Sequence, residues 1–311
     1  MAEIEIKTLN ERVKNDPVAL VKAAEDRYHN KIAELAMLAV DHKDLRAILL
    51  AGPSGSGKTT TANLLADAIK ERGEEAIVLS LDDFYKDADD PEYPRCKGGE
   101  RDFESPAALH LDDVIHTLEC ITEGKPFLSP KYDFKSASRV SEGIHPAMPD
   151  GCVIIEGLHA LNPIISEKLP KDKILKLFVS VSTNINNGDE RIISGRKLRF
   201  IRRMVRDSIY RAADANRTLD MWHGVIKGED DYLYPYKGSA DVAFDTFHDF
   251  ELGVMKERAT ALLEKVTEPD PFVQTVRQAL LAAEPIDDAL VPTSSLIREF
   301  ISGGKYHEVY G

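Results

Sequence analysis

The sequence predicts an α/β fold in which helices cover a doubly wound, mostly parallel sheet. The run Gly52-Pro53-Ser54-Gly55-Ser56-Gly57-Lys58-Thr59 fits the pattern G-x-x-x-x-G-K-[ST] and stands between an apolar run and a helical pattern. From about residue 46 to about residue 266, apolar runs of strand length alternate with helical patterns, which is typical of parallel sheets. A chain of 311 residues can form one large domain of this class or two small ones.

Five short apolar runs, each followed by a polar or glycine-rich segment, are the expected core strands. They cover residues 47–51, 76–81, 152–156, 175–181 and 241–244. Between about residues 125 and 147 the pattern changes to short extended runs that contain Phe127, Tyr132 and Phe134. This composition predicts a small β-hairpin or a short extended insertion beside the sheet.

Two terminal extensions flank a core that we place at residues 46–267. In residues 1–45, Ile4 and Ile6 alternate with acids and predict a short edge strand, and Asp16-Pro17 predicts the start of a long helix that reaches about Val40. Residues 268–311 begin with a proline-containing break at 268–271 and carry apolar residues at helical spacing, at 272–281 and 296–301. Each extension is too short to bury a core of its own. We expect both to pack on the core, while a second functional domain and a subunit interface stay open.

The composition excludes several classes of protein. A net charge of −13 argues against a nucleic-acid or anionic-membrane binder, because such binding needs a basic face. The three cysteines lie far apart, which is typical neither of a zinc site nor of a disulfide framework. The acidic N-terminus lacks a signal-peptide pattern, and no apolar run has membrane-spanning length. We expect a cytoplasmic protein without a membrane or nucleic-acid partner, and homo-oligomer formation stays open.

The glycine-rich run has the chemistry of a loop that binds a nucleoside triphosphate. Its glycines allow backbone N–H groups to surround the phosphates, Lys58 adds a positive charge, and the hydroxyl of Thr59 is placed to bind Mg²⁺. The residues expected to contact the phosphates are Gly52, Ser54, Gly55, Ser56, Gly57, Lys58, Thr59 and Thr60. The sequence therefore predicts a P-loop NTPase fold that uses ATP and Mg²⁺, although the choice of ATP over other triphosphates stays open.

Carboxylates follow two of the expected strands, at the sheet edge where a parallel sheet binds ligands. Asp82 and Asp83 follow the strand at 76–81, and a kinase needs a carboxylate that accepts the proton of the attacking hydroxyl. Asp82 is the expected base, and Asp83 is either its substitute or part of a turn. Glu156 ends the strand at 152–156 and is the expected magnesium ligand. We interpret His159 as structural.

A run of arginines forms one face of an expected helix within residues 186–224. Arg199, Arg202, Arg203 and Arg206 follow helical spacing, which is unusual in so acidic a chain. Guanidinium groups suit phosphate oxygens, so this segment is interpreted as an arginine-rich lid whose Arg203 and Arg206 act in catalysis with Asp82 and Lys58. The alternative is a solvated helix paired with Glu190 and Asp207, which applies most to Arg196 and Arg199.

These motifs, in this order, resemble the phosphoribulokinase/uridine kinase family. The resemblance rests on residues 52–61, 80–85, 103–106, 132–134, 138–139, 155–157 and 202–207, within about residues 46–265. It implies that Asp82 is the base, that Glu104 binds ribose hydroxyls, that Tyr132 lies against the base, and that Arg203, Arg206 and Arg211 act in the lid and the substrate site. The acceptor-binding residues expected from it are Asp82, Tyr85, Glu104, Tyr132, Arg139, Arg206 and Arg211.

Three positions depart from the family pattern, all in the part that would bind the acceptor. Glu104 stands where the family has Asp, and Ala137 and Ala213 replace polar residues that read the base in relatives. The resemblance implies an ATP-dependent transferase that phosphorylates a primary hydroxyl, with the 5′-OH of uridine or cytidine expected, as in pyrimidine salvage. A kinase for a sugar phosphate, a polyol or glycerate is the alternative. A non-enzymatic nucleotide switch is a further one, which the absence of a guanine-reading N-K-x-D motif disfavours.

Overall fold

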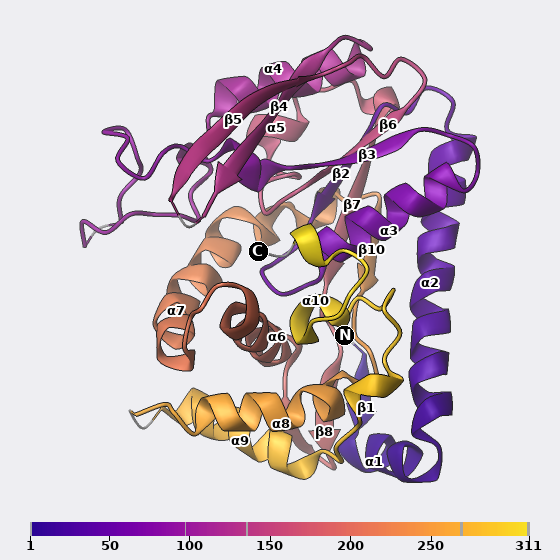
Figure 1. Cartoon of the computed structure of the whole chain (residues 1–311), viewed down its shortest axis with the longest axis vertical. Coiled ribbons are helices and arrows are strands. Elements are labelled where there is room, and N and C mark those ends of the chain that lie inside the picture. Colours follow the sequence, from indigo (N-terminus) through magenta and orange to yellow (C-terminus); the bar gives the residue numbers. More distant parts are fainter. Residues whose placement is uncertain (1, 97, 135, 268–269, 310–311) are drawn as a thin grey trace.

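The computed structural model describes residues 2–96, 98–134, 136–267 and 270–309 (Figure 1). Its central feature is a five-stranded parallel sheet with the strand order β10-β7-β2-β6-β3. Each predicted core strand is present, with ends shifted by at most one residue. The strands are β2 (Ala47–Ala51), β3 (Ala76–Ser80), β6 (Cys152–Glu156), β7 (Ile174–Ser180) and β10 (Val242–Asp245).

Helices cover both faces of this sheet, which confirms the predicted α/β class. The central strand β2 is buried along its whole length, and its side chains alternate between two apolar clusters. Ile48 and Leu50 face one cluster, and Leu49 faces the other. The first cluster is built with α2 (Pro17–Asp41), α3 (Lys58–Lys70), α6 (Gly195–Tyr210), α7 (Ala215–Tyr232), α8 (Glu251–Leu263) and α9 (Pro271–Ala282). The second is built with α4 (Leu111–Thr122) and the short α5 (Pro163–Ser166).

The hairpin predicted near residues 125–147 is present beside the main sheet. Strands β4 (Phe127–Asp133) and β5 (Ser138–His145) pair antiparallel, with a register shift between Lys131 and Tyr132. Phe127 anchors the hairpin in the second cluster, whereas the outer strand β5 is largely exposed. Figure 1 shows the hairpin next to α4.

A second small sheet was not predicted. The N-terminal strand β1 (Glu3–Glu5) is present near the expected Ile4, but it pairs in parallel with β8 (Asn184–Asn187) instead of joining the main sheet. Strand β9 (Glu190–Ile193) completes this sheet, and helix α1 (Ile6–Asn15) follows β1 directly. The β1–β8 pairing joins residues about 180 positions apart, so no local sequence pattern predicts it.

The described parts of both terminal extensions pack against the rest of the molecule. The long helix begins at Pro17 with the Asp16 side chain accepting a hydrogen bond from the Ala19 N–H, as its sequence predicts, and packs on α3. At the other end, α9 packs on α8, and a short helix, α10 (Arg298–Ile301), contacts α6. Part of the predicted break, residues 268–269, lies outside the described residues. No helix in the described part of the chain has the length and apolarity needed to cross a bilayer.

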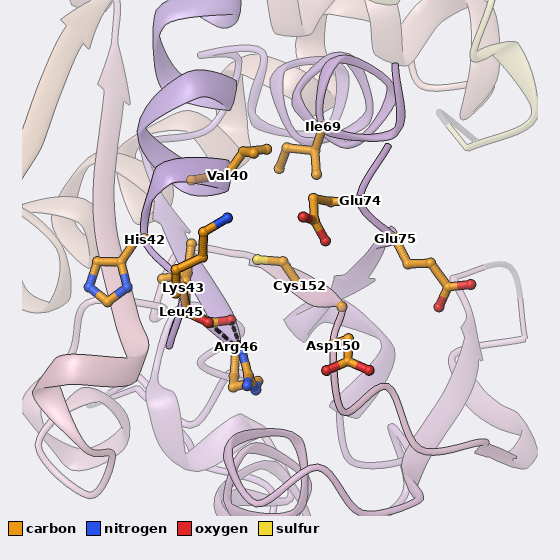
Figure 2. Close-up of a pocket in the computed structure, with 12 residues that line it drawn as sticks. Val40, His42, Lys43, Leu45, Arg46, Ile69, Glu74, Glu75, Asp150 and Cys152 are labelled. Carbon is orange, nitrogen blue, oxygen red and sulfur yellow. Dashed lines mark hydrogen bonds between the residues drawn. The ribbon is translucent and has the colours of Figure 1, made fainter. Parts of the chain in front are cut away.

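A small cavity lies where the strands β2, β3 and β6 begin (Figure 2). Its volume of about 50 Å³ has room for one or two water molecules and not for a substrate. Arg46 at its rim donates hydrogen bonds to the carbonyl oxygens of Lys43 and Leu45. Burial raises the pKa of the Cys152 thiol in its wall to about 12, which makes this cysteine a poor nucleophile. The cavity is at the opposite end of the sheet from the glycine-rich loop.

Candidate active site

The glycine-rich loop joins β2 to α3 and has the backbone geometry of an anion site. Gly55 and Gly57 adopt positive φ angles of 73° and 83°, a region that disfavours residues with a Cβ atom. Gly57 precedes the first residue of α3, so the first N–H groups of the helix point into the loop. Among the described residues, the N–H groups of Gly55, Lys58 and Thr59 have no protein acceptor. Such free donors at a helix N-terminus fit the phosphates of a nucleotide.

Lys58 places its ammonium group among the carboxylates of the site. Its Nζ lies 3.4 Å from the Pro53 carbonyl oxygen, within the loop. Its positive charge lowers the pKa values of both Asp82 and Glu156, although burial raises both pKa values on balance. The loop lysine, the strand-end Asp82 and Glu156 therefore lie close enough for their charges to interact.

Glu156 and two hydroxyl groups form the part of the site that fits a magnesium ion. The Thr59 hydroxyl donates to Glu156 Oε1 at 3.3 Å, and the Ser80 hydroxyl donates to the same oxygen at 2.9 Å. Carboxylate and hydroxyl oxygens are the ligands that Mg²⁺ prefers, and the ion is usually held by one or two protein groups plus phosphate oxygens. The described residues contain no group of three or more acidic, histidine or cysteine side chains that could hold a metal by themselves.

Asp82 lies directly after β3, in a short turn of 3₁₀ helix at Leu81–Phe84. Its N–H donates to the Ser80 hydroxyl at 3.3 Å, and this hydroxyl in turn donates to Glu156. Within the described parts of the chain its carboxylate receives no hydrogen bond, so both oxygens are available. Burial and the neighbouring Asp83 raise its pKa, against the positive charges of Lys58, Arg211 and Arg206.

Asp83 has a different environment from its neighbour. Its carboxylate accepts a hydrogen bond from the Lys131 ammonium at 2.7 Å and another from the Tyr132 N–H at 3.1 Å. Both partners lie at the register shift of β4. Asp83 therefore connects the turn after β3 to the hairpin and is not free to receive a proton from an acceptor.

Glu104 lies on the other side of the site, against α7. A Cβ atom built on Gly228 would lie 2.2 Å from Glu104 Cβ, so the glycine leaves the space that the glutamate occupies. Burial, with the Glu229 and Asp82 charges, raises the pKa of Glu104 to about 7, although Arg203 and Lys58 oppose the rise. A carboxyl group with this pKa can accept or donate a hydrogen bond to a ligand near neutral pH.

Three aromatic side chains cluster near Asp82: Tyr85 from the turn after β3, and Tyr132 and Phe134 from the hairpin. The Tyr85 and Tyr132 ring centroids lie 5.8 Å apart, and Phe134 lies 5.2 Å from Tyr132 and 6.3 Å from Tyr85. The Arg211 guanidinium lies 5.6 Å from the centroid of the Phe134 ring. This arrangement brings Tyr85, Tyr132 and Arg211 together near Asp82, and it suits a flat, partly polar ligand.

Arg139, which was also expected at the acceptor, makes its contacts within the hairpin region. Its Nη1 lies 3.0 Å from Asp113 on α4 and 3.2 Å from Glu142 on β5, and its N–H donates to Asp87. These contacts hold the hairpin against α4. None of them joins Arg139 to Asp82 or Glu104.

The arginines of α6 divide into two groups. Arg199 and Arg202 are completely buried and paired, Arg199 with Glu229 at 2.7 and 2.8 Å, and Arg202 with Glu251 at 2.5 and 2.9 Å. Arg199 also donates to the Ser54 carbonyl oxygen, and Arg202 donates to that of Gly55. These two buried side chains therefore fix the backbone of the phosphate loop through its carbonyl oxygens.

Arg203, Arg206 and Arg211 form the second group, around the carboxylate of Asp207. Arg206 donates two hydrogen bonds to Asp207 Oδ1, at 2.9 and 2.7 Å, and Arg203 Nε and Arg211 Nε lie 3.3 and 3.8 Å from this carboxylate. Arg203 also donates to the Ser54 hydroxyl at 2.9 Å. The group carries more positive than negative charge and faces Asp82, whose pKa it lowers. This is the arrangement expected for stabilising a transferred phosphoryl group.

Sequence reasoning missed the acids that hold these arginines. Glu190 was considered as a partner, but the buried arginines pair with Glu229 and Glu251 instead. One signal in the sequence could have indicated them. A buried guanidinium requires a carboxylate partner, and both Glu229 and Glu251 lie on helices among apolar residues.

His159, expected to be structural, is 2% exposed, and its ring lies 6.1 Å from that of Tyr232. Burial lowers its pKa to about 4, against the opposing effect of the Glu104 main chain, so the ring is neutral at physiological pH.

The sequence matches the model of the phosphoribulokinase/uridine kinase family over residues 47–252, which is more than half of the chain. Among curated relatives, a uridine kinase of Halobacterium salinarum is 24% identical over 223 residues, covering 71% of this chain and 89% of that protein. A uridine kinase of Bacillus pumilus is 27% identical over 194 residues, covering 62% of this chain and 82% of that protein.

Longer relatives match over a smaller part of their length. The uridine/cytidine kinase UKL1 of Arabidopsis thaliana is 26% identical over 194 residues, which are 62% of this chain and 36% of the plant protein. This chain therefore spans well under two thirds of that relative. Among solved structures, a candidate fructose transport system kinase from Silicibacter sp. TM1040 matches with a TM-score of 0.50 and 18% identity, covering 68% of this chain and 98% of that one. At this identity the match supports the fold alone.

Proposed function

Because this chain belongs to the phosphoribulokinase/uridine kinase family, we propose that it is a kinase that transfers the γ-phosphoryl group of ATP to a primary hydroxyl group. The observation that carries this proposal is the position of Asp82. Its carboxylate is free of protein partners within the described residues, lies among the charges of Lys58, Arg206 and Arg211, and follows β3 beside the phosphate loop. A nucleotide switch would have no use for such a carboxylate.

The residues of the site have separate tasks in this reaction. Asp82 accepts the proton of the acceptor hydroxyl and orients its oxygen toward the phosphoryl group. Lys58, Arg203 and Arg206 stabilise the negative charge of that group, and the free N–H groups of the loop hold the remaining phosphates. Thr59 and Glu156 are the residues that would hold Mg²⁺, which supplies further charge neutralisation when bound.

For the acceptor, we propose a pyrimidine nucleoside that is phosphorylated on its 5′-OH. The names of the relatives support this acceptor, and so do the side chains near Asp82. The aromatic cluster of Tyr85, Tyr132 and Phe134 provides flat apolar faces, and Glu104 provides a carboxyl group for the ribose hydroxyls.

Ala137 and Ala213 favour a second candidate, a kinase of the same fold that acts on a sugar phosphate, a polyol or glycerate. Ala137 lies in the hairpin turn with a φ of 52°, and the Ala213 N–H donates to the Asp207 carbonyl oxygen. Neither side chain can form a hydrogen bond with a base. A site that reads a base discriminates through such bonds, so their loss permits a smaller acceptor.

The test is ADP release by the purified chain with ATP and Mg²⁺, measured separately with uridine, cytidine, sugar phosphates, polyols, glycerate and no acceptor. Stimulation by uridine or cytidine supports the nucleoside kinase. Stimulation confined to another hydroxyl compound supports the second candidate. Hydrolysis that no acceptor stimulates would contradict both and favour a nucleotide switch.

A further inference from the structure

The C-terminal segment, residues 295–301, has no role in the proposed reaction, yet it lies against the phosphate loop. Figure 1 shows the yellow end of the chain, with α10, close to α6 and the start of α3. Leu296, Ile297, Phe300 and Ile301 are completely buried.

Leu296 makes the first contact with the loop. A Cβ atom built on Gly57 would lie 2.5 Å from Leu296 Cδ1, so the leucine side chain rests directly on the glycine backbone. Gly57 has the positive φ that turns the following N–H groups toward the phosphate position. Glycine is the residue with the most freedom to leave such a conformation. Leu296 therefore restricts the loop where it is intrinsically most flexible.

Glu299 makes the second contact, with the first turn of α3. Its Oε2 accepts a hydrogen bond of 2.7 Å from the Thr60 hydroxyl, and its side chain is 5% exposed. Its charge also reaches the lid arginines: the pKa of Arg206 is raised although burial opposes this, because Asp207 and Glu299 lie nearby. One carboxylate thus connects the helix that begins the phosphate site with the helix that carries the catalytic arginines.

Phe300 makes the third contact, through Arg202. The Arg202 guanidinium lies 5.1 Å from the centroid of the Phe300 ring and donates to the Gly55 carbonyl oxygen at 3.2 Å. The segment is in turn anchored to the N-terminal extension, since the Ser295 hydroxyl donates to Glu25 on α2 at 2.5 Å.

We propose that residues 295–301 are a positioning element of the nucleotide site, in which Leu296, Glu299 and Phe300 hold the phosphate loop and the first turn of α3 in their binding conformation. The inference rests on the proposed function only in requiring that the loop binds a nucleotide. A loop held in advance loses less conformational freedom on binding, so affinity rises. By linkage, a bound nucleotide must also stabilise the docked segment.

The test compares four variants by calorimetric titration with ADP and Mg²⁺ and by steady-state kinetics. Leu296→Ala and Glu299→Ala should weaken ADP binding about fivefold or more and raise the KM for ATP, with the KM for the acceptor unchanged. Glu299→Gln can still accept the Thr60 hydrogen bond and should restore affinity to within about threefold of the unmodified chain. Val276→Ala is the matched control, because Val276 is also completely buried in the C-terminal extension, on α9. It should lower the melting temperature without weakening ADP binding.

A second measurement uses the unmodified chain and so does not depend on whether variants fold. ADP and Mg²⁺ should slow amide hydrogen exchange in residues 295–301 more than in α9. Equal protection of both segments would contradict the inference.

The other outcomes are also decisive. Equal ADP affinity in all four variants, or a loss shared by Val276→Ala, would overturn the positioning role while leaving the proposed function intact. Tighter binding by Glu299→Ala would show that the carboxylate opposes the phosphates and would overturn it too. Absence of ADP binding by the unmodified chain would instead remove the proposed function, and the inference with it.

Discussion

At the scale of single residues, the neighbours Asp82 and Asp83 show how the fold separates two identical side chains. The turn after β3 directs Asp83 to Lys131 and the Tyr132 N–H, and it leaves Asp82 among the positive charges of the phosphate site. From the sequence Asp-Asp alone, the two residues could be ranked as the catalytic base only by their position in the chain. Their different contacts predict that replacing Asp82 changes kcat and that replacing Asp83 changes the KM for the acceptor.

Replacing Asp82 with Asn should lower kcat by about 10²–10⁴, which is the usual effect of removing a positioned general base. ATP affinity should change little, because Asp82 lies near Lys58 but forms no hydrogen bond with the phosphate loop among the described residues. Asp83→Asn is the matched control and should mainly raise the KM for the acceptor, since it loosens the hairpin. Steady-state kinetics of both variants, with titration of ATP, check this. A normal kcat in Asp82→Asn would mean that another group takes the proton.

Glu104 should give the stability of the protein a measurable pH dependence. Its pKa rises from 4.5 in a model compound to about 7 in the folded chain, with burial as the main cause. Between these two pH values the folded state binds more protons at this group than the unfolded state does. The contribution of Glu104 to stability is therefore complete below pH 4.5 and is lost as the pH rises through 7.

The check is the free energy of unfolding of Glu104→Gln and of the unmodified chain, by urea denaturation at pH 5 and pH 8. Relative to the unmodified chain, the variant should gain about 1–3 kcal/mol between these values, the lower figure allowing for the partial exposure of the side chain. A difference that does not change with pH would show that the carboxyl group titrates normally.

At the scale of secondary-structure elements, helix α7 decides where Glu104 lies. Gly228 packs so closely on the glutamate that a methyl group would displace it. Gly228→Ala should therefore lower kcat/KM for the acceptor by about tenfold or more and leave the KM for ATP unchanged. Gly224→Ala is the control, because nothing beyond the adjacent residues and backbone of its own helix lies within 4 Å of the position a Cβ would take there, and alanine should stabilise the helix by up to about 1 kcal/mol. If both variants had the same kcat/KM for the acceptor, the contact between Gly228 and Glu104 would have no role in acceptor binding.

The elements that local sequence could predict are those with local causes. The run Ala-Ile-Leu-Leu-Ala is buried on both sides in β2, and the glycine loop follows it directly, so both were expected in place. The pairing of β1 with β8 could not be predicted, because it joins distant segments that are not strongly apolar. The same is true of Glu229 and Glu251, whose partners are arginines 30 and 49 residues away. Contacts of this kind depend on the completed fold.

At the scale of the whole molecule, the two extensions meet at the phosphate-binding helix. On one side the Tyr28 hydroxyl bonds that of Thr61, and on the other Glu299 bonds that of Thr60. Their apolar faces were visible in the sequence, but their docking site was not, because an amphipathic pattern defines which face is buried and not what covers it. The structure places both extensions against helix α3, which follows the loop that the sequence identifies most clearly.

The N-terminal helix should accordingly support stability and contribute nothing directly to phosphotransfer. Leu35 on α2 is 2% exposed and belongs to the apolar cluster that α2 shares with α3. Leu35→Ala should lower the free energy of unfolding by about 2–5 kcal/mol, the usual cost of such a truncation in a core. Leu38→Ala on the same helix is the control, because Leu38 is 44% exposed, and it should change stability by less than about 0.5 kcal/mol. Chemical denaturation checks the effect on stability. Measuring kcat at a temperature where both variants are folded checks that phosphotransfer is unchanged. If Leu35→Ala lowered kcat while the protein remained folded, α2 would have to act on the phosphate site through α3, and its role would be more than structural.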